Sequence, residues 1–292
     1  MDKPKILIQL DADNQASVFD AVVAIDSGAD HLLRHSGVKP ELVRDLIYGA
    51  IFTRGPKDLA NTAVFVGGSD LAAAERLFQE ATRQLLPQFG LRVSILLDPG
   101  GSNTTAAAAV RAAAKHLELG GLPALVLGAT GPVGQRVARL LAGQGANVYV
   151  GSRELTRATA VCDAILARLP DAKVHPVGTA SELRTVIKQV ALVVAAGAAG
   201  TLLLPKAIRT TCPGLRVAID LNAVPPAGIE GVEATDDGVE RDGAICYGAL
   251  AIGGAKMKIH KAAVRRLFES NDQILDAEEI YALASQLDEK LV

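Results

Sequence analysis

Short apolar runs alternate with longer amphipathic segments along most of this 292-residue chain. Parallel strands need a crossover connection, usually a helix, so this alternation is typical of an α/β fold with parallel sheets. At roughly 150 residues per domain, the length corresponds to about two domains. Strands are predicted at 5–10, 63–66, 92–96, 124–127, 147–150, 172–177, 192–195 and 216–220, and helices at 17–27, 39–46, 70–86, 104–117, 133–141, 157–169, 181–189 and 255–285.

A cluster of turn-forming residues at 98–103 separates the two predicted domains. The alanine-dense helix that follows is expected to connect them and to end at Gly120-Gly121, because glycine readily adopts the left-handed conformation after a helix. We predict a first α/β domain over 1–103 that is completed by a C-terminal helix over 261–292, a connecting helix over 104–121, and a second, doubly wound domain over 122–260.

The charge balance argues against nucleic-acid and membrane partners. Lys and Arg number 30 against 32 Asp and Glu, aromatic residues make up 3%, and Trp is absent. Such a chain lacks a basic footprint and the aromatic platforms on which single-stranded bases stack. The three cysteines have no C-x-x-C spacing, which predicts neither disulfides nor a zinc site and is typical of the cytoplasm. The first residues hold only a short apolar stretch, so we expect no signal peptide and no membrane span.

A glycine-rich motif follows the strand predicted at 124–127 and opens the helix predicted at 133–141. Glycines at such a turn let the backbone approach a pyrophosphate, whose charge is met by N–H groups at the positive end of the helix. The same turn can form without a ligand, but its place in a strand-helix-strand unit favours a dinucleotide. The predicted binding residues are Gly128, Ala129, Thr130, Gly131, Pro132, Val133 and Gly134.

The end of the strand predicted at 147–150 indicates which dinucleotide binds. An NAD site usually has an Asp or Glu there for the ribose hydroxyls, whereas this chain has Ser152 and Arg153, with Arg157 four residues further on. Arginine forms charge-assisted hydrogen bonds with phosphate, so these residues favour the 2′-phosphate of NADP. Both arginines could instead be solvated surface residues, and Glu154 could approach a ribose, which leaves the use of NAD open.

Further ligand contacts are predicted where later segments follow their strands. Ala196 and Gly197 follow the strand at 192–195 and are assigned to the cofactor. Asn222 leaves the carboxyl end of the next strand, where open α/β sheets bind ligands, and is also assigned to the cofactor, as part of the nicotinamide pocket. A proline-stiffened connection is an equal alternative. A third glycine group at 248–254 precedes Lys256 and would suit an anionic substrate tail, unless Lys256 lies on a solvated helix face.

Other polar residues have plainer explanations. His31 and His35 lack a third ligand at zinc spacing and are interpreted as surface histidines, so no metal site is predicted. Asp11 and Asp13 lack the glycine and the final glutamate of a calcium loop and are expected to cap a strand end. The chain has no G-x-S-x-G motif, which argues against hydrolases of that type, whereas hydride transfer needs no protein nucleophile.

A series of sequence blocks in order spans nearly the whole chain, at 17–20, 28–31, 53–55, 65–68, 101–105, 130–134, 222–229, 248–254, 267–270 and 276–281. Together they resemble the bacterial NAD(P)-dependent methylene-tetrahydromethanopterin and methylene-tetrahydrofolate dehydrogenases of one-carbon metabolism. So many separate blocks make this resemblance far more specific than the glycine motif alone.

The resemblance implies a pterin-binding N-terminal domain and a Rossmann domain that faces it across a cleft. It also implies that the methylene bridge between two pterin-side nitrogens is oxidised to a methenyl cation, with hydride transfer to NADP. Because the cation is delocalised over those nitrogens, no base has to remove a proton, and catalysis would depend on positioning and electrostatics. The family further implies a homo-oligomer, as a trimer or a multiple of one.

Individual residues are carried over by their positions in the matching blocks. Asp20, Asn103 and Lys256 fall in blocks that face the cleft and are predicted, with Asn222, to contact the pterin. Asp20 and Lys256 are the predicted catalytic residues, although Lys256 could instead form a salt bridge across the domain interface. Thr130 and the two arginines near 153–157 match cofactor-phosphate positions.

Two points stay open at this level. The block at 222–229 resembles the branch devoted to methanopterin, whereas the terminal blocks resemble the NADP-specific branch that accepts both pterins, so neither the preferred pterin nor strict use of NADP is decided. The alternatives to this family are another NADP-dependent Rossmann dehydrogenase, of shikimate or amino-acid type, and a non-catalytic protein that senses NADP.

Overall fold

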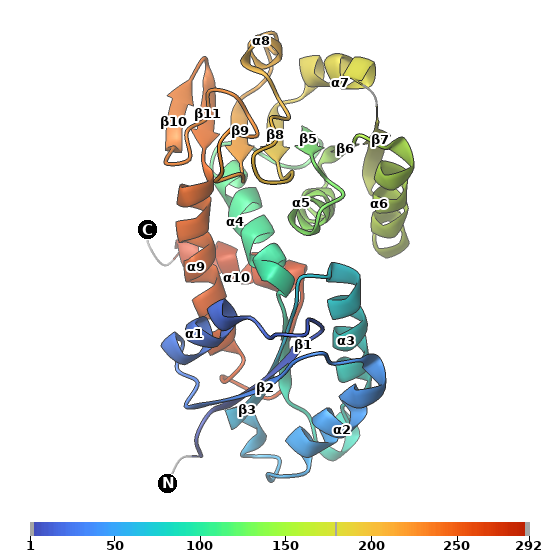
Figure 1. Ribbon diagram of the computed structural model, residues 1–292, viewed down its shortest axis with the longest axis vertical. Helices are drawn as coiled ribbons and strands as arrows, with labels where there is room; N and C mark the ends of the chain where they lie inside the picture. Colours follow the sequence, from blue (N-terminus) through green and yellow to red (C-terminus); the bar gives the residue numbers. More distant parts are fainter. Residues whose placement is uncertain (1–2, 179, 290–292) are drawn as a thin grey trace. The chain divides into compact units, whose positions relative to one another are not determined.

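The computed structural model describes residues 3–178 and 180–289 (Figure 1). The chain divides into two units, of which the first consists of Met1–Thr104 and Met257–Val292 and the second of Thr105–Lys256. Each unit has its own β-sheet. The first unit is therefore assembled from both ends of the chain, whereas the second is one continuous segment.

A five-stranded parallel sheet forms the centre of the first unit, in the order β12-β4-β3-β1-β2. The chain places β2 on one side of β1 and then returns to place β3 on the other side. The elements are β1 Ile6–Asp11, α1 Val18–Asp26, β2 His31–His35, α2 Pro40–Ile51, η1 Leu59–Asn61, β3 Thr62–Gly67, α3 Leu71–Arg83, η2 Pro87–Phe89, β4 Ser94–Leu97, η3 Pro99–Gly101, β12 Ile274–Leu275 and α10 Ala277–Glu289.

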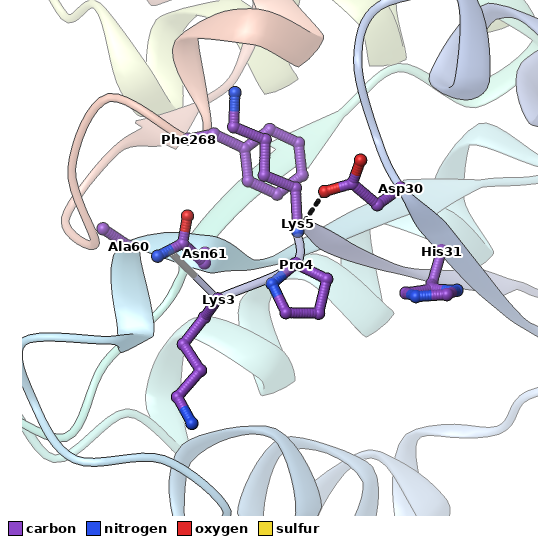
Figure 2. Close-up of a pocket in the computed structure, with 8 residues that line it drawn as sticks. All are labelled: Lys3, Pro4, Lys5, Asp30, His31, Ala60, Asn61 and Phe268. Carbon is purple, nitrogen blue, oxygen red and sulfur yellow. Dashed lines mark hydrogen bonds between the residues drawn. The ribbon is translucent and has the colours of Figure 1, made fainter. Parts of the chain in front are cut away.

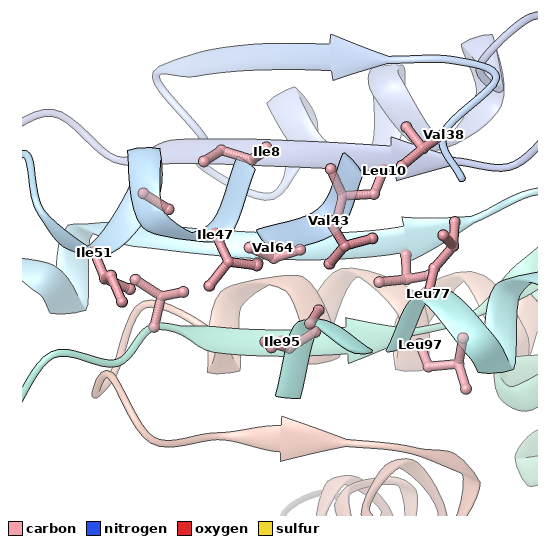
Figure 3. Packing of buried hydrophobic residues seen from close by; sticks show 14 of the residues in the cluster. Ile8, Leu10, Val38, Val43, Ile47, Ile51, Val64, Leu77, Ile95 and Leu97 are labelled. Carbon is pink, nitrogen blue, oxygen red and sulfur yellow. The ribbon is translucent and has the colours of Figure 1, made fainter. Parts of the chain in front are cut away.

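One face of this sheet is packed by α2 and α3, as Figure 3 shows. Alternate residues along a strand point to one face, so Ile8 and Leu10 of β1 lie on the same side of the sheet. They pack with Ile47 of α2 and Leu77 of α3, all fully or almost fully buried. The intervening residues of the central strands, among them Phe65 of β3, point to the opposite face.

A seven-stranded sheet forms the centre of the second unit, in the order β10-β11-β9-β8-β5-β6-β7. Its strands are parallel except β10, which pairs antiparallel with β11. The elements are β5 Pro123–Leu127, α5 Pro132–Gly143, β6 Asn147–Gly151, α6 Leu155–Arg168, β7 Lys173–Val177, α7 Ala180–Val186, η4 Ile187–Gln189, β8 Leu192–Ala195, α8 Lys206–Arg209, β9 Val217–Asp220, β10 Asp237–Arg241 and β11 Ala244–Tyr247. Two helices, α4 Ser102–Ala114 and α9 Ala249–Arg266, contain the boundaries between the units.

The predicted connecting helix was wrong at both ends, because α4 starts at Ser102 and stops at Ala114. At its start, the buried Asp98 carboxylate accepts hydrogen bonds from backbone N–H groups of the first helical turn. After the end of α4, Nε2 of the His116 ring lies 2.8 Å from the Tyr247 hydroxyl. The backbone carbonyl of His116 accepts a hydrogen bond from the Arg216 side chain. These side-chain bonds hold the segment in a turn well before Gly120-Gly121.

The predicted tail helix over 255–285 is two helices with a strand between them. The first, α9, starts earlier, so the glycine group at 248–254 forms its beginning rather than a loop. The Gln273 carbonyl accepts a hydrogen bond from Ile95 N–H, which aligns β12 with β4. Asp276 then caps α10, since its carboxylate accepts from Ala277 N–H while Glu279 accepts from Asp276 N–H.

Three smaller features differ from the sequence prediction: the cap of α3, the β10–β11 hairpin and the strand β2. Asp70, not Ser69, caps α3, while Ser69 donates a hydrogen bond to the Asp13 carboxylate. The β10–β11 hairpin was not predicted, although Asp242-Gly243 at its turn is a recognised hairpin signal and both residues have positive φ. The edge strand β2 was missed because its residues are mostly exposed.

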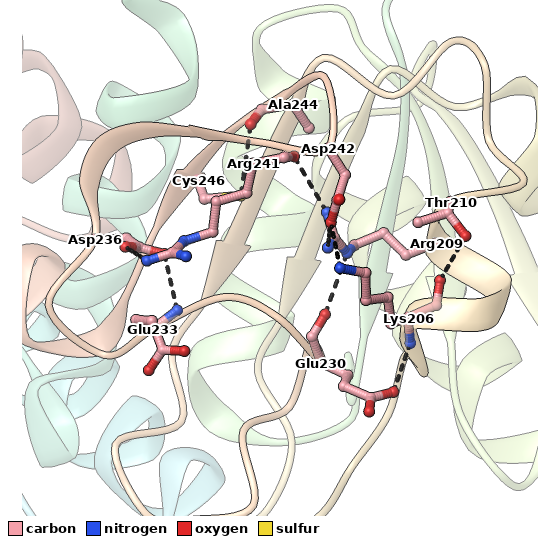
Figure 4. A network of polar contacts seen from close by, with 10 residues as sticks. All are labelled: Lys206, Arg209, Thr210, Glu230, Glu233, Asp236, Arg241, Asp242, Ala244 and Cys246. Carbon is pink, nitrogen blue, oxygen red and sulfur yellow. Dashed lines mark hydrogen bonds and ion pairs between the residues drawn. The ribbon is translucent and has the colours of Figure 1, made fainter.

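A polar network ties this hairpin to the rest of the second unit (Figure 4). Arg241 donates two hydrogen bonds, of 2.6 and 2.7 Å, to the carboxylate of Asp236, which is only 3% exposed. Burial raises the pKa of Asp236. The hydrogen bonds from Arg241 and from Glu233 N–H together lower this pKa by more, so the net pKa is below its ordinary value. The buried guanidinium of Arg209 binds Asp242 at the hairpin turn.

We expect Arg241→Ala to lower the free energy of unfolding near neutral pH, because the buried Asp236 carboxylate loses two hydrogen bonds from a charged donor. Because the folded-state pKa of Asp236 is lowered, the stabilisation is complete above the unfolded-state pKa of about 3.9 and is lost as pH falls through the folded-state value. Urea unfolding of the wild-type protein and of Arg241→Ala should show that the difference in their free energies of unfolding becomes smaller from neutral to acid pH. Arg44→Ala, which removes an ion pair between two exposed side chains, should cost less than about 0.5 kcal/mol throughout.

Candidate functional site

The candidate cofactor site lies where the strand order of the second sheet reverses. From β5 the chain proceeds to β6 and β7 on one side, and then returns to β8 on the other side of β5. The carboxyl ends of β5 and β8 flank this switch point, where open α/β sheets bind ligands. Gly128 follows β5, and Ala196 and Gly197 follow β8, so three predicted cofactor residues lie together here.

Two glycines of the motif are required by backbone packing. Gly128 has a φ of +67°, and a Cβ on it would lie 2.5 Å from the Cα of Gly197. A Cβ on Gly134 would lie 2.6 Å from the Gly128 carbonyl oxygen, so this glycine lets α5 pack against the turn. Gly131, in contrast, has room for a Cβ. The motif therefore brings β5, β8 and the start of α5 closer together than any other residue would allow.

The start of α5 has no side-chain cap. Gly131 is the N-cap residue and makes no side-chain capping bond, and Pro132 occupies the first turn without an N–H to satisfy. Thr130 is half-buried beside it, and its carbonyl accepts a hydrogen bond from the Gln135 side chain. Helix N-termini attract phosphate because their N–H groups and dipole are positive.

The end of β6 supplies positive charge on the other side of β5. Arg153 and Arg157 are both exposed, and within residues 3–178 and 180–289 neither makes a side-chain hydrogen bond or an ion pair. The Ser152 hydroxyl accepts a hydrogen bond from Glu154 N–H. Glu154 is the N-cap residue of α6 but forms no side-chain capping bond. Two arginines without a protein partner fit a ligand phosphate better than a ribose hydroxyl alone.

Asn222 is fixed within the loop that follows β9. Its Oδ1 accepts hydrogen bonds from Val224 N–H and Gly200 N–H, and its Nδ2 donates to the Pro226 carbonyl at 3.0 Å. The buried Asp220 carboxylate accepts from Asn222 N–H and Ile229 N–H; burial raises its pKa, and these bonds oppose the shift. The Asn222 side chain thus shapes the loop, and its role as a ligand contact stays a prediction.

The sheet of the first unit has its own switch point, between β1 and β3. Asp11 ends β1, and its carboxylate accepts hydrogen bonds from Asp13 N–H and Ser17 N–H, as expected for a strand-end cap. Asp20, in the first turn of α1, is buried, and a Cβ on Gly67 at the end of β3 would lie 3.5 Å from its Oδ2. Asp20 therefore lies at the edge where this sheet is expected to bind a ligand.

Asn103 and Lys256 are the other predicted pterin residues. Asn103 is completely buried, and its Nδ2 donates to the Leu97 carbonyl and to Asp276 at 2.7 and 3.0 Å. Both amide hydrogens are thus used inside the unit, which makes Asn103 a structural link between β4 and α10. Lys256 is buried within α9 rather than on a solvated face.

The sequence interpretation missed two buried residues at this edge, Asp98 and His260. Asp98 follows β4 and holds the start of α4, and His260 of α9 lies beside it. The turn cluster at 98–103 was a signal for Asp98. For His260 the signal was its spacing of four residues from Lys256, which places both on one helix face.

A pocket of about 800 Å³ lies at the amino ends of the strands of the first sheet, away from Asp20 (Figure 2). It is lined by residues before β1 and β3, by Asp30 and His31 at the start of β2, and by Phe268, whose ring centroid is 5.7 Å from the Lys5 ammonium. Lys5 N–H donates to Asp30 across it. Parallel sheets bind ligands at carboxyl rather than amino ends, so this pocket is not the candidate substrate site.

Among residues 3–178 and 180–289, no group of three or more His, Cys, Asp or Glu side chains is arranged to hold a metal ion. None of the helices in this part of the chain combines the length and the apolar character needed to cross a bilayer. His31 and His35 lie at the two ends of the edge strand β2, not on a helix.

Solved structures of low sequence identity share the fold. Quinate dehydrogenase from Corynebacterium glutamicum is 16% identical with a TM-score of 0.54, over 97% of this chain and all of that chain. Shikimate 5-dehydrogenase from Listeria monocytogenes is 15% identical with a TM-score of 0.53, over 96% of each chain. These similarities confirm the predicted α/β architecture of two sheet domains, the second Rossmann-like.

Sequence comparison identifies the family. Residues 18–100 match the family model described as methylene-tetrahydromethanopterin dehydrogenase, N-terminal. The bifunctional protein MdtA of Methylorubrum extorquens is 44% identical over 97% of this chain and 99% of that protein. The NAD(P)-dependent methylenetetrahydromethanopterin dehydrogenase of the same organism is 32% identical over 93% of this chain and 94% of that protein. The chain therefore belongs to the family of NAD(P)-dependent methylene-tetrahydromethanopterin dehydrogenases.

Proposed function

We propose that this protein oxidises the methylene bridge of methylene-tetrahydromethanopterin, and also of methylene-tetrahydrofolate, to the methenyl form with hydride transfer to NADP. Family membership supports the reaction class, since a relative of 32% identity is named for this activity with NAD(P). The pair of arginines after β6 supports NADP in particular. This pair is the observation that carries the choice of cofactor.

The residues of the second unit fit the parts of NADP. The uncapped start of α5 and the turn at Gly128 would hold the pyrophosphate through backbone N–H groups. Arg153 and Arg157, with the Ser152 hydroxyl beside them, would hold the 2′-phosphate. Ala196 and Gly197 would lie along the cofactor at the end of β8. NADP, when bound, accepts the hydride, and the protein fixes its orientation.

The residues of the first unit would bind and polarise the pterin. In the reaction, the methylene C–H bond breaks with its electron pair, and the positive charge that remains is shared by the two neighbouring nitrogens. A buried carboxylate near this charge stabilises it, because Coulomb attraction is strong where water is excluded. We assign this role to Asp20, which is buried at the switch point of the first sheet. No proton has to be removed from carbon.

Asn103 of the first unit, and Lys256 and Asn222 of the second, are also assigned to the pterin. Lys256 would donate hydrogen bonds to pterin oxygens. Asn103 would act mainly by fixing the start of α4, because its amide hydrogens already bind Leu97 and Asp276. Asn222 would act through the loop after β9, because the hydrogen bonds of its side chain determine the shape of that loop.

Assembly into a homo-oligomer, a trimer or a multiple of one, is part of the proposal. The support in this chain is a run of exposed apolar side chains on one face of α1. Val18, Val22 and Ile25 are 60%, 56% and 52% exposed. Contiguous exposed apolar residues on a soluble domain are typical of an interface between proteins. Light scattering of the purified protein would give the subunit number.

The reaction is tested by following absorbance with methylene-tetrahydromethanopterin or methylene-tetrahydrofolate, each with NADP and with NAD. Turnover of both pterins with NADP would support the full proposal. Turnover of methylene-tetrahydromethanopterin alone would limit the proposed substrate range to that pterin. NADP binding without turnover of any pterin would favour a sensing protein. Reduction of NADP by shikimate or an amino acid, with none by the pterins, would place it in another dehydrogenase class.

We expect Arg153→Ala and Arg157→Ala each to raise the KM for NADP by about tenfold or more, because each removes a charge-assisted hydrogen bond to the 2′-phosphate. The KM for NAD should change by less than about twofold, since NAD has no such phosphate. Steady-state kinetics with both cofactors measures the difference. Arg168→Ala, which removes the same charge at the far end of α6, should leave both values unchanged. Equal effects on NAD and NADP would contradict the phosphate contact.

We expect Asp20→Asn to lower kcat roughly a hundredfold or more, the scale seen when one stabilising group is removed from a developing charge. The substitution keeps the side-chain volume, and the KM for NADP should stay the same because the residue lies in the other unit. Asp26→Asn is the matched control, since it removes an exposed carboxylate from the same helix. A normal kcat in Asp20→Asn would remove this residue from the catalytic assignment.

A further inference from the structure

His260 of α9 is a completely buried imidazole on the face of the first sheet opposite to α2 and α3. Its ring stacks on Phe65 of β3, with centroids 5.8 Å apart and planes 9° from parallel. A second ring, that of Phe19 in α1, lies 6.2 Å away and is tilted by 46°. The imidazole is therefore enclosed by aromatic side chains from a strand and from another helix.

The third neighbour of His260 is a buried carboxylate. Its Nδ1 lies 3.7 Å from Oδ2 of Asp98, which is also completely inaccessible. The same Oδ2 accepts a hydrogen bond of 2.7 Å from the Thr104 hydroxyl, and Oδ1 accepts from Asn103 N–H at 2.9 Å. Asp98 thus connects His260 with the first turn of α4.

Each of these contacts leads to a residue of the proposed pterin site. Phe19 directly precedes Asp20 in α1, and Asp98 binds the backbone of Asn103. Lys256 lies four residues before His260 in α9, so the two side chains project from one face of the helix, one turn apart. The buried ring therefore contacts the residue that precedes Asp20 and the carboxylate that binds Asn103, and it lies one helical turn from Lys256.

We propose that His260 is a positioning residue that fixes Asp20, Asn103 and Lys256 relative to one another for the oxidation of the pterin. This inference rests on the proposed function. His260 acts through its neighbours and is assigned no contact with substrate or cofactor. Its flat ring holds α9 and α1 against β3, and its ring nitrogen faces the carboxylate that holds α4. A displacement of about 1 Å in a site of this kind can lower the rate about a hundredfold.

Two substitutions separate the two parts of this role. His260→Phe keeps a ring to stack on Phe65 but has no nitrogen toward Asp98, whereas His260→Gln keeps a polar group and loses the aromatic ring. We expect each to lower kcat/KM for the pterin by about tenfold to a hundredfold. The KM for NADP should remain within about twofold, because its site belongs to the continuous second unit. His31→Phe, which changes an exposed histidine of the same unit, should alter neither value.

The experiment measures kcat and KM for both substrates, together with the thermal unfolding midpoint of each variant. A histidine that serves only to fill the core would lower the midpoint and leave the kinetics of the folded protein unchanged, and this result would overturn the inference alone. A selective loss in the pterin parameters, with NADP binding intact in at least one variant, would support it. If the wild-type protein turns over no methylene pterin, the proposed function fails, and this inference fails with it.

Discussion

The buried carboxylate of Asp98 holds together parts of the first unit that are far apart in sequence. It follows β4, accepts hydrogen bonds from the start of α4 and faces His260 of α9. Asn103, which it orients, donates in turn to Asp276 at the start of α10. A buried charge needs such partners, because an unpaired carboxylate in the interior is very costly. The hydrogen bonds that satisfy Asp98 therefore hold the start of α4, from which Asn103 binds α10, while His260 of α9 lies beside the carboxylate.

The second unit depends instead on close contact between backbones. Gly128 and Gly197 bring the ends of β5 and β8 together, and Gly134 brings α5 against the same turn. These contacts leave little side-chain bulk at the switch point. The positive charges proposed to bind the cofactor, those of Arg153 and Arg157, lie outside the switch point, after β6. Each half of the proposed reaction thus has its own architecture: a buried polar cluster for the pterin, and an open turn with exposed arginines for the cofactor.

Most of the fold could be predicted from the sequence, because buried strands and amphipathic helices carry strong local patterns. The central strands, the glycine motif and the family blocks were all identified, and the fold class and the family are confirmed. Elements set by tertiary contacts were not. β12 has only two residues and exists because it pairs with β4, and β2 is too exposed to show a buried pattern. His260 is marked in the sequence only by its spacing from Lys256, and its environment of Phe65, Phe19 and Asp98 is formed only when the chain folds.

The discontinuity of the first unit has a consequence for synthesis of the protein on the ribosome. Residues of the second unit form a continuous segment and can fold once they have emerged, whereas β12, α10 and the last turns of α9 are made at the very end. Until then β4 is an open edge strand with unpaired backbone groups, which is a hazard for aggregation. A truncation before Gln273 would leave that edge permanently exposed, so the integrity of the last twenty or so residues should decide how much of the protein accumulates in the cell.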